Sequence, residues 1–96
     1  MPENDTGGEQ EVPLGMTVAT QGALAALTAD DIHFALLRHV AGDWGDLEIC
    51  DKKANDSALV CEGRLVSAYH SATGVKFYII TEWDRSYTTV LLPSEY

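Results

Sequence analysis

The sequence predicts an α+β domain in which N-terminal helices pack on a small antiparallel sheet. Two observations carry this prediction: a helix-period apolar pattern with capping signals at residues 28–42, and three successive strand-like segments in the last third of the chain. With 96 residues, the chain has the size of one domain with a single modest core.

The segment TADDIHFALLRHVAG has the clearest helical pattern. Thr28 can cap its start, and Asp31 follows three residues later, where a capping box usually has Glu or Gln. Gly42 is expected to act as the C-cap that ends the helix. The apolar face is formed by residues with helical spacing: Ile32, Ala35, Leu36, His39 and Val40.

Weaker patterns lie on both sides of this helix. Before it, PLGMTVAT has a short strand pattern with Leu14, Met16 and Val18 at alternate positions, and QGALAALT predicts a helical turn or two. After it, GDWG is typical of a tight turn with an aromatic plug. Residues 50–61 can form a short helix, which Asn-Asp-Ser at 55–57 weakens.

Three β-rich segments form an expected C-terminal meander: residues 64–70, 75–82 and 87–92. The loops SATG and WDRS have lengths that suit hairpins. Both faces of the middle segment are partly apolar, which predicts an interior strand covered by a helix on at least one side.

Residues 1–12 contain four acids, no base and no apolar periodicity, so we expect a disordered acidic tail followed by one domain at 13–96. No apolar run approaches the roughly 20 residues that span a bilayer. The acidic, polar start is unlike a signal peptide. We therefore expect a cytoplasmic protein with no membrane contact.

Two cysteines, Cys50 and Cys61, are too few for the disulfide framework of a small secreted domain, and we expect reduced thiols. No CxxC or HxxxH spacing supports a metal site. Gly-rich phosphate loops, GxSxG and HExxH are absent from the sequence, so we predict no metal and no cofactor.

The net charge is −9, which disfavours direct contact with nucleic acid. Solubility is the ordinary meaning of such acidity. The alternative is an acidic face that mimics phosphates toward a basic partner. Its candidate residues are Asp43, Asp46, Glu48, Asp51, Asp56 and Glu62.

The loop sequence EWDRS contains an aromatic residue that a hairpin turn does not need. Either Trp83 folds back onto an apolar face, or Glu82, Trp83, Asp84 and Arg85 form a contact surface. The second interpretation follows from the prominence of Trp and Arg in binding hot spots.

A second candidate site combines His39, Arg64, Tyr69 and Arg85, which can converge on a small twisted sheet and act on a phosphate. The alternative is a core histidine and two arginines paired with Glu62 and Asp84. We assign no role to the other two histidines, His33 and His70.

From Pro13 to Tyr96 the chain resembles a family of small, uncharacterised bacterial proteins described as plasmid-related or mobile-element-associated. The resemblance lies in five blocks: PLGMTVATQGALAAL, RHVAGDWGDL, DKKAND, GRLVSAY and FYIITEWDRSYTTVLLPSEY. It implies a mobile-element context and no established activity. Trp83 departs from the family pattern, which often has a small residue there, and this departure favours a local packing role.

The order of elements is also similar to barnase- and RelE-type ribonuclease toxins, for which His39, Arg64, Arg85 and Thr88 are the residues at stake. The acidic charge argues against that function. We therefore expect a non-enzymatic accessory protein that binds an unidentified partner protein, through the EWDRS hairpin and the acidic middle of the chain at Asp43 and Asp46. The sequence leaves the oligomeric state open.

Overall fold

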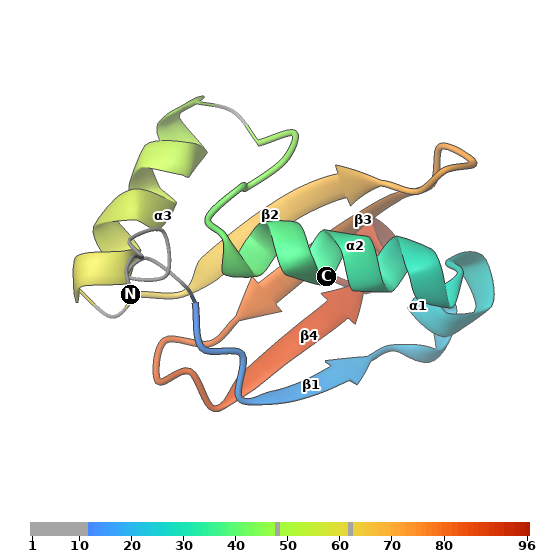
Figure 1. Ribbon diagram of the computed structural model, residues 1–96, viewed down its shortest axis with the longest axis horizontal. Helices are drawn as coiled ribbons and strands as arrows, with labels where there is room; N and C mark the ends of the chain where they lie inside the picture. The colour runs from blue at the N-terminus through green and yellow to red at the C-terminus, as the bar shows by residue number, and fades with distance from the viewer. Residues whose placement is uncertain (1–11, 48, 62) are drawn as a thin grey trace, which may run out of the picture.

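A four-stranded mixed sheet organises the chain, with helices on its faces (Figure 1). The computed structural model describes residues 12–47, 49–61 and 63–96. The elements follow in the order β1 (Met16–Ala19), α1 (Gln21–Ala26), α2 (Ala29–Val40), α3 (Ile49–Cys61), β2 (Leu65–His70), β3 (Lys76–Thr81), β4 (Tyr87–Leu91) and the 3-10 helix η2 (Pro93–Glu95). The predicted α+β class and the C-terminal three-strand meander are confirmed.

The strand order is β1-β4-β3-β2, so β3 is an interior strand as predicted. The meander strands pair antiparallel, but β1 pairs parallel with β4, Met16 lying opposite Tyr87. The expectation of a purely antiparallel sheet is therefore wrong. The chain leaves β1 through α1 and α2 and returns much later, and β4 then runs in the same direction as β1.

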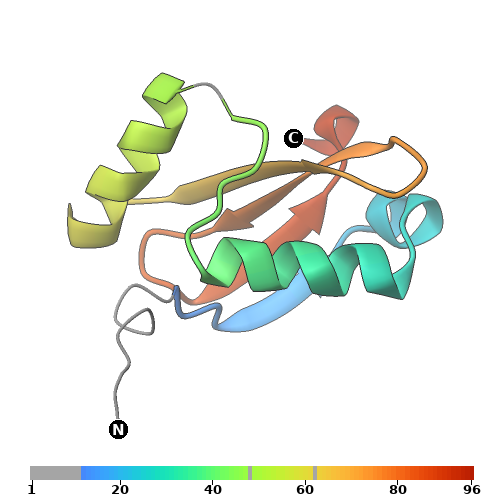
Figure 2. The ribbon, with the colours of Figure 1, turned by 45° about the horizontal axis from the view of Figure 1, so that its top comes forward.

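Helix α2 begins at a complete capping box, in which Asp31 takes the position usual for Glu or Gln. The Thr28 side chain accepts from the Asp31 N–H, and the Asp31 carboxylate accepts from the Thr28 N–H. Figure 2 shows α2 lying across one face of the sheet. The helix brings Ala35 and His39 onto the sheet, as its apolar spacing predicts.

The main core lies between α1, α2 and the sheet face that α2 covers. It contains Ala23, Leu27, Ala35, Tyr69, Phe77, Ile79 and Val90. A second, smaller cluster joins Val12, Trp44 and Leu65. Trp44 is the aromatic plug that the GDWG turn predicts, and Val12, the last residue of the expected tail, is buried against it. Residues 1–11 of that tail lie outside the described residues.

The outer edge of β2 is hydrogen-bonded to two other segments of the chain, α3 and residues 44–46. The Asn55 side chain of α3 pairs with the backbone of Val66, donating to its carbonyl at 2.6 Å and accepting from its N–H at 3.1 Å. Further along, Ala68 exchanges backbone hydrogen bonds with Trp44 and Asp46. This edge of the sheet therefore has hydrogen-bonding partners within the chain.

Candidate partner-binding surface

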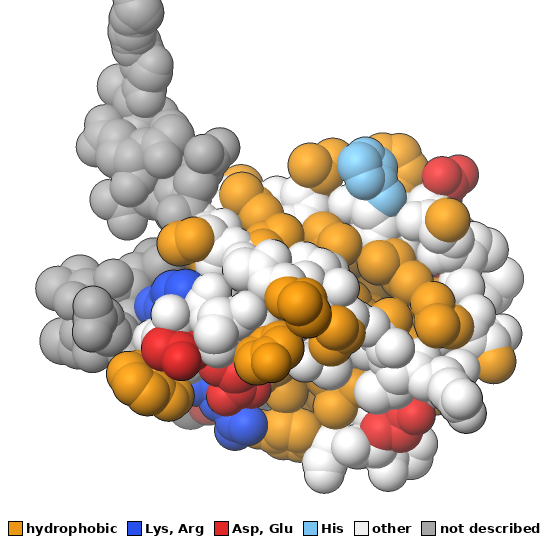
Figure 3. All heavy atoms as spheres, turned by 90° about the horizontal axis from the view of Figure 1, so that it is seen from below, with side chains coloured by type: hydrophobic (Ala, Val, Ile, Leu, Met, Phe, Trp, Pro, Cys, Tyr) orange, Lys and Arg blue, Asp and Glu red, His pale blue; other side chains and the backbone are white. Residues whose placement is uncertain are grey.

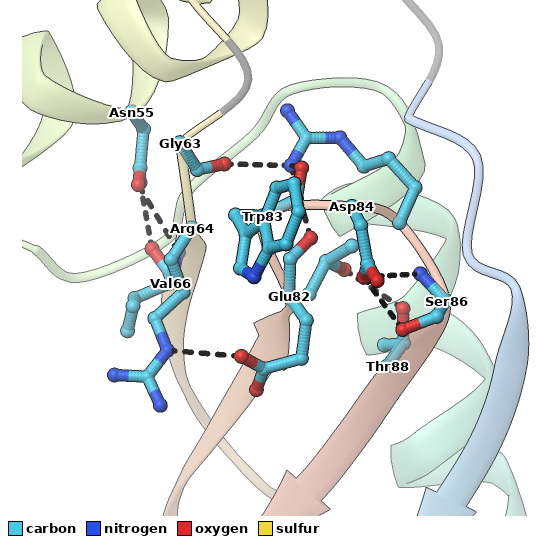
Figure 4. A network of polar contacts seen from close by, with 11 residues as sticks. Asn55, Gly63, Arg64, Val66, Glu82, Trp83, Asp84, Ser86 and Thr88 are labelled. Carbon is cyan, nitrogen blue, oxygen red and sulfur yellow. Dashed lines mark hydrogen bonds and ion pairs between the residues drawn. The ribbon is translucent and has the colours of Figure 1, made fainter.

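The hairpin between β3 and β4 is a braced turn. The Glu82 N–H donates to the Tyr87 carbonyl at 3.0 Å, and the Arg85 N–H donates to the Glu82 carbonyl at 2.9 Å. Asp84 accepts from both the hydroxyl and the N–H of Ser86 (Figure 4). These bonds hold the pKa of Asp84 below its ordinary value. The loop conformation is thus set by its own polar groups.

Arg85 has a backbone φ of 62°, in the left-handed region that a residue with a Cβ enters at a cost of roughly 1–2 kcal/mol. Its Nη1 donates to the carbonyls of Gly63, Glu82 and Trp83, at 2.6, 3.1 and 3.3 Å. The first of these bonds ties the hairpin to the chain entering β2. Hydrogen bonds from a charged donor are among the stronger ones, and they offset the backbone cost.

The start of β1 braces the hairpin from the other side. The Met16 N–H donates to the Ser86 carbonyl at 2.9 Å. Gly15, with φ +64°, lets the two backbones approach, because a Cβ there would collide with the carbonyls of Arg85 and Ser86. The tip is consequently held by its own hydrogen bonds and by two other parts of the chain, at Gly63 and at Met16.

Trp83 projects from this braced tip into solvent, with 61% of its surface exposed. The expectation that it packs locally onto an apolar face is therefore wrong. Figure 4 shows hydrogen bonds around its backbone and none to its indole. An exposed indole on a rigid turn has little conformational entropy to lose on binding, which is the property of a binding anchor.

Beside Trp83, the Arg64 Nε lies 3.6 Å from the Glu82 carboxylate (Figure 4). Glu62, the partner expected for Arg64, lies outside the described residues. Arg64 also borders a hollow of about 320 Å³ on the sheet face opposite α2. Its lining is mixed apolar, aromatic and charged: Leu47, Asp51, Ala54, Asn55, Arg64, Val66, Tyr78 and Tyr96. A side chain of a bound partner can enter this hollow.

We expect Arg85→Ala to lower the free energy of unfolding by about 2 kcal/mol, because it removes the bonds to three carbonyls and keeps the left-handed backbone. Arg85→Gly removes the same bonds and relieves the backbone, so it should be about 1 kcal/mol less destabilising. Urea unfolding of both variants measures the difference. An equal or larger loss in the glycine variant would contradict this description of the turn.

His39 lies in the core, fully buried, rather than in an accessible cleft. Its Nδ1 lies 2.5 Å from the Ser67 hydroxyl, and its Nε2 lies 2.9 Å from the Thr81 hydroxyl. Thr81 in turn contacts Thr88, whose hydroxyl donates to the Leu14 carbonyl. Because the Thr88 hydroxyl donates its hydrogen to the Leu14 carbonyl, it must accept from the Thr81 hydroxyl. The Thr81 hydroxyl, having donated its own hydrogen to Thr88, accepts from His39 Nε2–H.

This chain of donors assigns one neutral tautomer, with Nδ1 accepting from Ser67. Burial, with a smaller contribution from the positive charge of Arg85, lowers the pKa of His39 to about 4. The ring is therefore neutral over the physiological range. It links α2 to β2, β3 and β4 through hydrogen bonds.

The residues of the ribonuclease hypothesis do not form one accessible site. His39 and Thr88 meet through Thr81, but both are fully buried and cannot contact an RNA phosphate. Tyr69, also considered for that site, is buried, and its hydroxyl donates to the Asp43 carbonyl. Burial raises the pKa of Tyr69 to about 12. Arg64 is exposed, and Arg85 is half-buried with its Nη1 bonded to backbone carbonyls.

The acidic residues of the middle segment are engaged separately. Asp43 forms an ion pair with Arg38 at 2.7 Å, which lowers the pKa of Asp43. Asp46 lies 2.7 Å from His70 Nδ1, and Asp56 accepts from the Trp44 Nε1–H. Glu48 and Glu62 lie outside the described residues.

His70 and Asp46 lie at the end of β2 that is remote from the hairpin, since Leu65 pairs with Thr81 and His70 with Lys76. The structure therefore brings Glu82, Trp83, Asp84 and Arg85 together and leaves Asp46 apart from them. The predicted binding residues do not form a single surface.

Within the described residues, no group of three or more His, Cys, Asp or Glu side chains could hold a metal ion. The thiols of Cys50 and Cys61 lie outside the described side chains. Of the helices that the structure describes, none combines the length and hydrophobicity needed to cross a bilayer.

Three features of this surface could not be predicted from the sequence. Arginine is not a residue type that indicates a left-handed backbone, so no sequence pattern predicts the hydrogen bonds by which Arg85 holds the turn. The Arg64–Glu82 pair joins residues from two strands. The hollow depends on α3 lying against the sheet, which no local pattern encodes.

The fold and this surface define a small α+β domain that presents a braced, tryptophan-bearing hairpin. In comparisons with protein-family models, curated proteins and solved structures, the chain has no significant match.

Proposed function

We propose that this chain is a non-enzymatic accessory protein that binds a partner protein, with the hairpin of residues 82–86 as its contact surface. The observation that carries the proposal is Trp83, 61% exposed on a turn that its neighbours hold in place. Covering a large apolar side chain with a partner lowers the free energy of the complex, and Trp is one of the residue types enriched in binding hot spots.

The partner should carry a net positive charge, because the whole chain has a net charge of −9. Glu82 beside Trp83 is paired with Arg64, so the attraction comes from the whole chain rather than from the hairpin alone. Asp84 keeps its negative charge into the acid range because Ser86 lowers its pKa. Opposite charges accelerate encounter, and salt screens them, so binding should weaken as the salt concentration rises.

The hollow beside Arg64 supplies a second contact in this proposal. A partner side chain that enters it would lie against Tyr78 and Tyr96 while Trp83 enters the partner. Such reciprocal insertion suits a specific complex better than a flat contact does. The mobile-element resemblance and the cytoplasmic location expected from the sequence belong to this proposal and point to proteins of the element or of its bacterial host.

Site-specific photo-cross-linking tests the proposal. A photoreactive phenylalanine analogue would replace Trp83 in one sample and Phe34 in another, in cells that naturally produce the chain. Both positions are 61% exposed, so the Phe34 sample controls for exposure alone. We expect one dominant protein adduct from position 83 and not from position 34. Identical adducts from the two positions, or none, would contradict the proposal.

A further inference from the structure

The outer edge of β1 has backbone groups that point away from the sheet. The Met16 N–H donates to the Ser86 carbonyl, and the Thr20 N–H donates to the Val90 carbonyl. In a parallel pair, alternate residues direct both backbone groups toward the neighbouring strand. The N–H and C=O of Thr17 and Ala19 therefore face outward, at an edge beyond which no further strand lies among the residues that the structure describes.

The two edges of the sheet are treated differently. On β2, the Asn55 side chain and the Trp44–Asp46 segment occupy the outward backbone groups. On β1, the sequence MTVA has no charge, proline or bulge, which are the usual protections of an exposed edge. An open, uncharged edge is a template for another strand.

β1 lies in an uncharged stretch of the sequence and exposes two apolar side chains. The apolar residues at alternate positions of this segment are typical of a strand with one buried face. In the structure, however, Met16 is 62% exposed and Val18 is 40% exposed. Residues 12–29 contain no charged side chain. Figure 3 shows many hydrophobic side chains on the face where β1 lies, with a group of charged side chains toward its lower left.

We propose that β1 pairs antiparallel with β1 of a second copy of this chain, forming one continuous eight-stranded sheet across a two-fold axis. A second copy fits because the strand is self-complementary about Val18. In that register Thr17 lies opposite Ala19 of the second copy, and each such pair exchanges two hydrogen bonds. The two Val18 side chains then meet as an apolar, β-branched pair.

The dimer contact and the hairpin contact should depend on salt in opposite ways. Two copies with a net charge of −9 each repel at long range, while the uncharged stretch allows them to touch. Salt screens the repulsion, so dimerisation should strengthen as salt rises. The proposed partner binding at Trp83 has the opposite salt dependence, and either proposal can therefore fail alone.

Sedimentation equilibrium across a wide concentration range tests the proposal. We expect the mass to approach twice that of one chain as concentration rises. Thr17→Pro removes an outward N–H without removing a bond to β4, and Val18→Lys places like charges opposite each other. Each should weaken dimerisation at least about tenfold. Trp83→Ala is the control and should dimerise like the wild type.

Hydrogen exchange locates the contact independently of any variant. The amides of Thr17 and Ala19 should exchange more slowly as the protein concentration rises, whereas the Trp83 amide should not change. A single-chain mass at every concentration and salt level would overturn the proposal. So would a dimer that both strand variants leave unchanged, or one whose formation leaves Thr17 and Ala19 unprotected.

Discussion

Replacing His39 with Gln is expected to remove most of the acid sensitivity of this fold between pH 6.5 and pH 4.5. In the unfolded chain the imidazole takes up a proton near its ordinary pKa of 6.5, whereas in the folded protein its pKa is about 4. Between those values the unfolded state binds more protons, so lowering the pH favours unfolding.

Above pH 6.5 neutral His39 should therefore make its full contribution to the free energy of unfolding of the wild type. This contribution should be lost progressively as the pH falls toward 4. The pKa difference corresponds to about 3 kcal/mol. Carboxylates with lowered pKa values, Asp31, Asp43, Asp84 and Glu95, act below about 4.5, at their ordinary values and lower. Among the residues that the structure describes, the loss of stability above pH 4.5 therefore comes mainly from His39.

Urea unfolding at a series of pH values measures this effect. His39→Gln should also be less stable than the wild type at pH 7, by about 2–3 kcal/mol, because the bonds to Ser67 and Thr81 are disturbed in the core. His33→Gln, at an exposed histidine, should keep the wild-type pH profile. A His39→Gln profile parallel to the wild type would show that another group carries the acid sensitivity.

Asn55→Ala is expected to lower the free energy of unfolding by about 2–3 kcal/mol, since it leaves the N–H and the carbonyl of Val66 without their partner. Asn55 is itself 4% exposed, so water does not readily replace the lost bonds. The Val66 amide should also lose its protection from hydrogen exchange.

Two further variants make the Asn55 test specific. Asn55→Asp keeps the shape but places a carboxylate oxygen against the Val66 carbonyl, so it should be at least as destabilising as alanine at pH 7. Ser57→Ala, at an exposed position of the same helix, should change stability by less than about 0.5 kcal/mol. If Asn55→Ala matched Ser57→Ala, the side chain would not be what covers the β2 edge.

Local patterns were enough to predict the elements whose signals lie within a few residues. The capping box of Thr28 and Asp31 and the spacing of Ala35 and His39 predicted α2. The β-branched segments and their short loops predicted the meander. These features depend on backbone hydrogen bonding and burial within the segment itself, so sequence spacing is sufficient to find them.

Contacts between segments distant in the sequence could not be predicted from such local patterns. By propensity Asn55 disfavours a helix, but in the structure its side chain bonds to a strand eleven residues away. The parallel pairing of β1 depends on where β4 returns, and the exposure of Trp83 depends on how Arg85 closes the turn. The same hairpin sequence is compatible with a buried or an exposed indole.

The most direct measurement of the central claim is the affinity of the partner captured at position 83 for two alanine variants. Trp83→Ala should weaken binding by about 30-fold or more, equivalent to 2 kcal/mol at a hot spot. Phe34→Ala, which removes an equally exposed ring from α2, should stay within about threefold of the wild type. Equal affinities of the two variants would contradict a contact centred on the Trp83 hairpin.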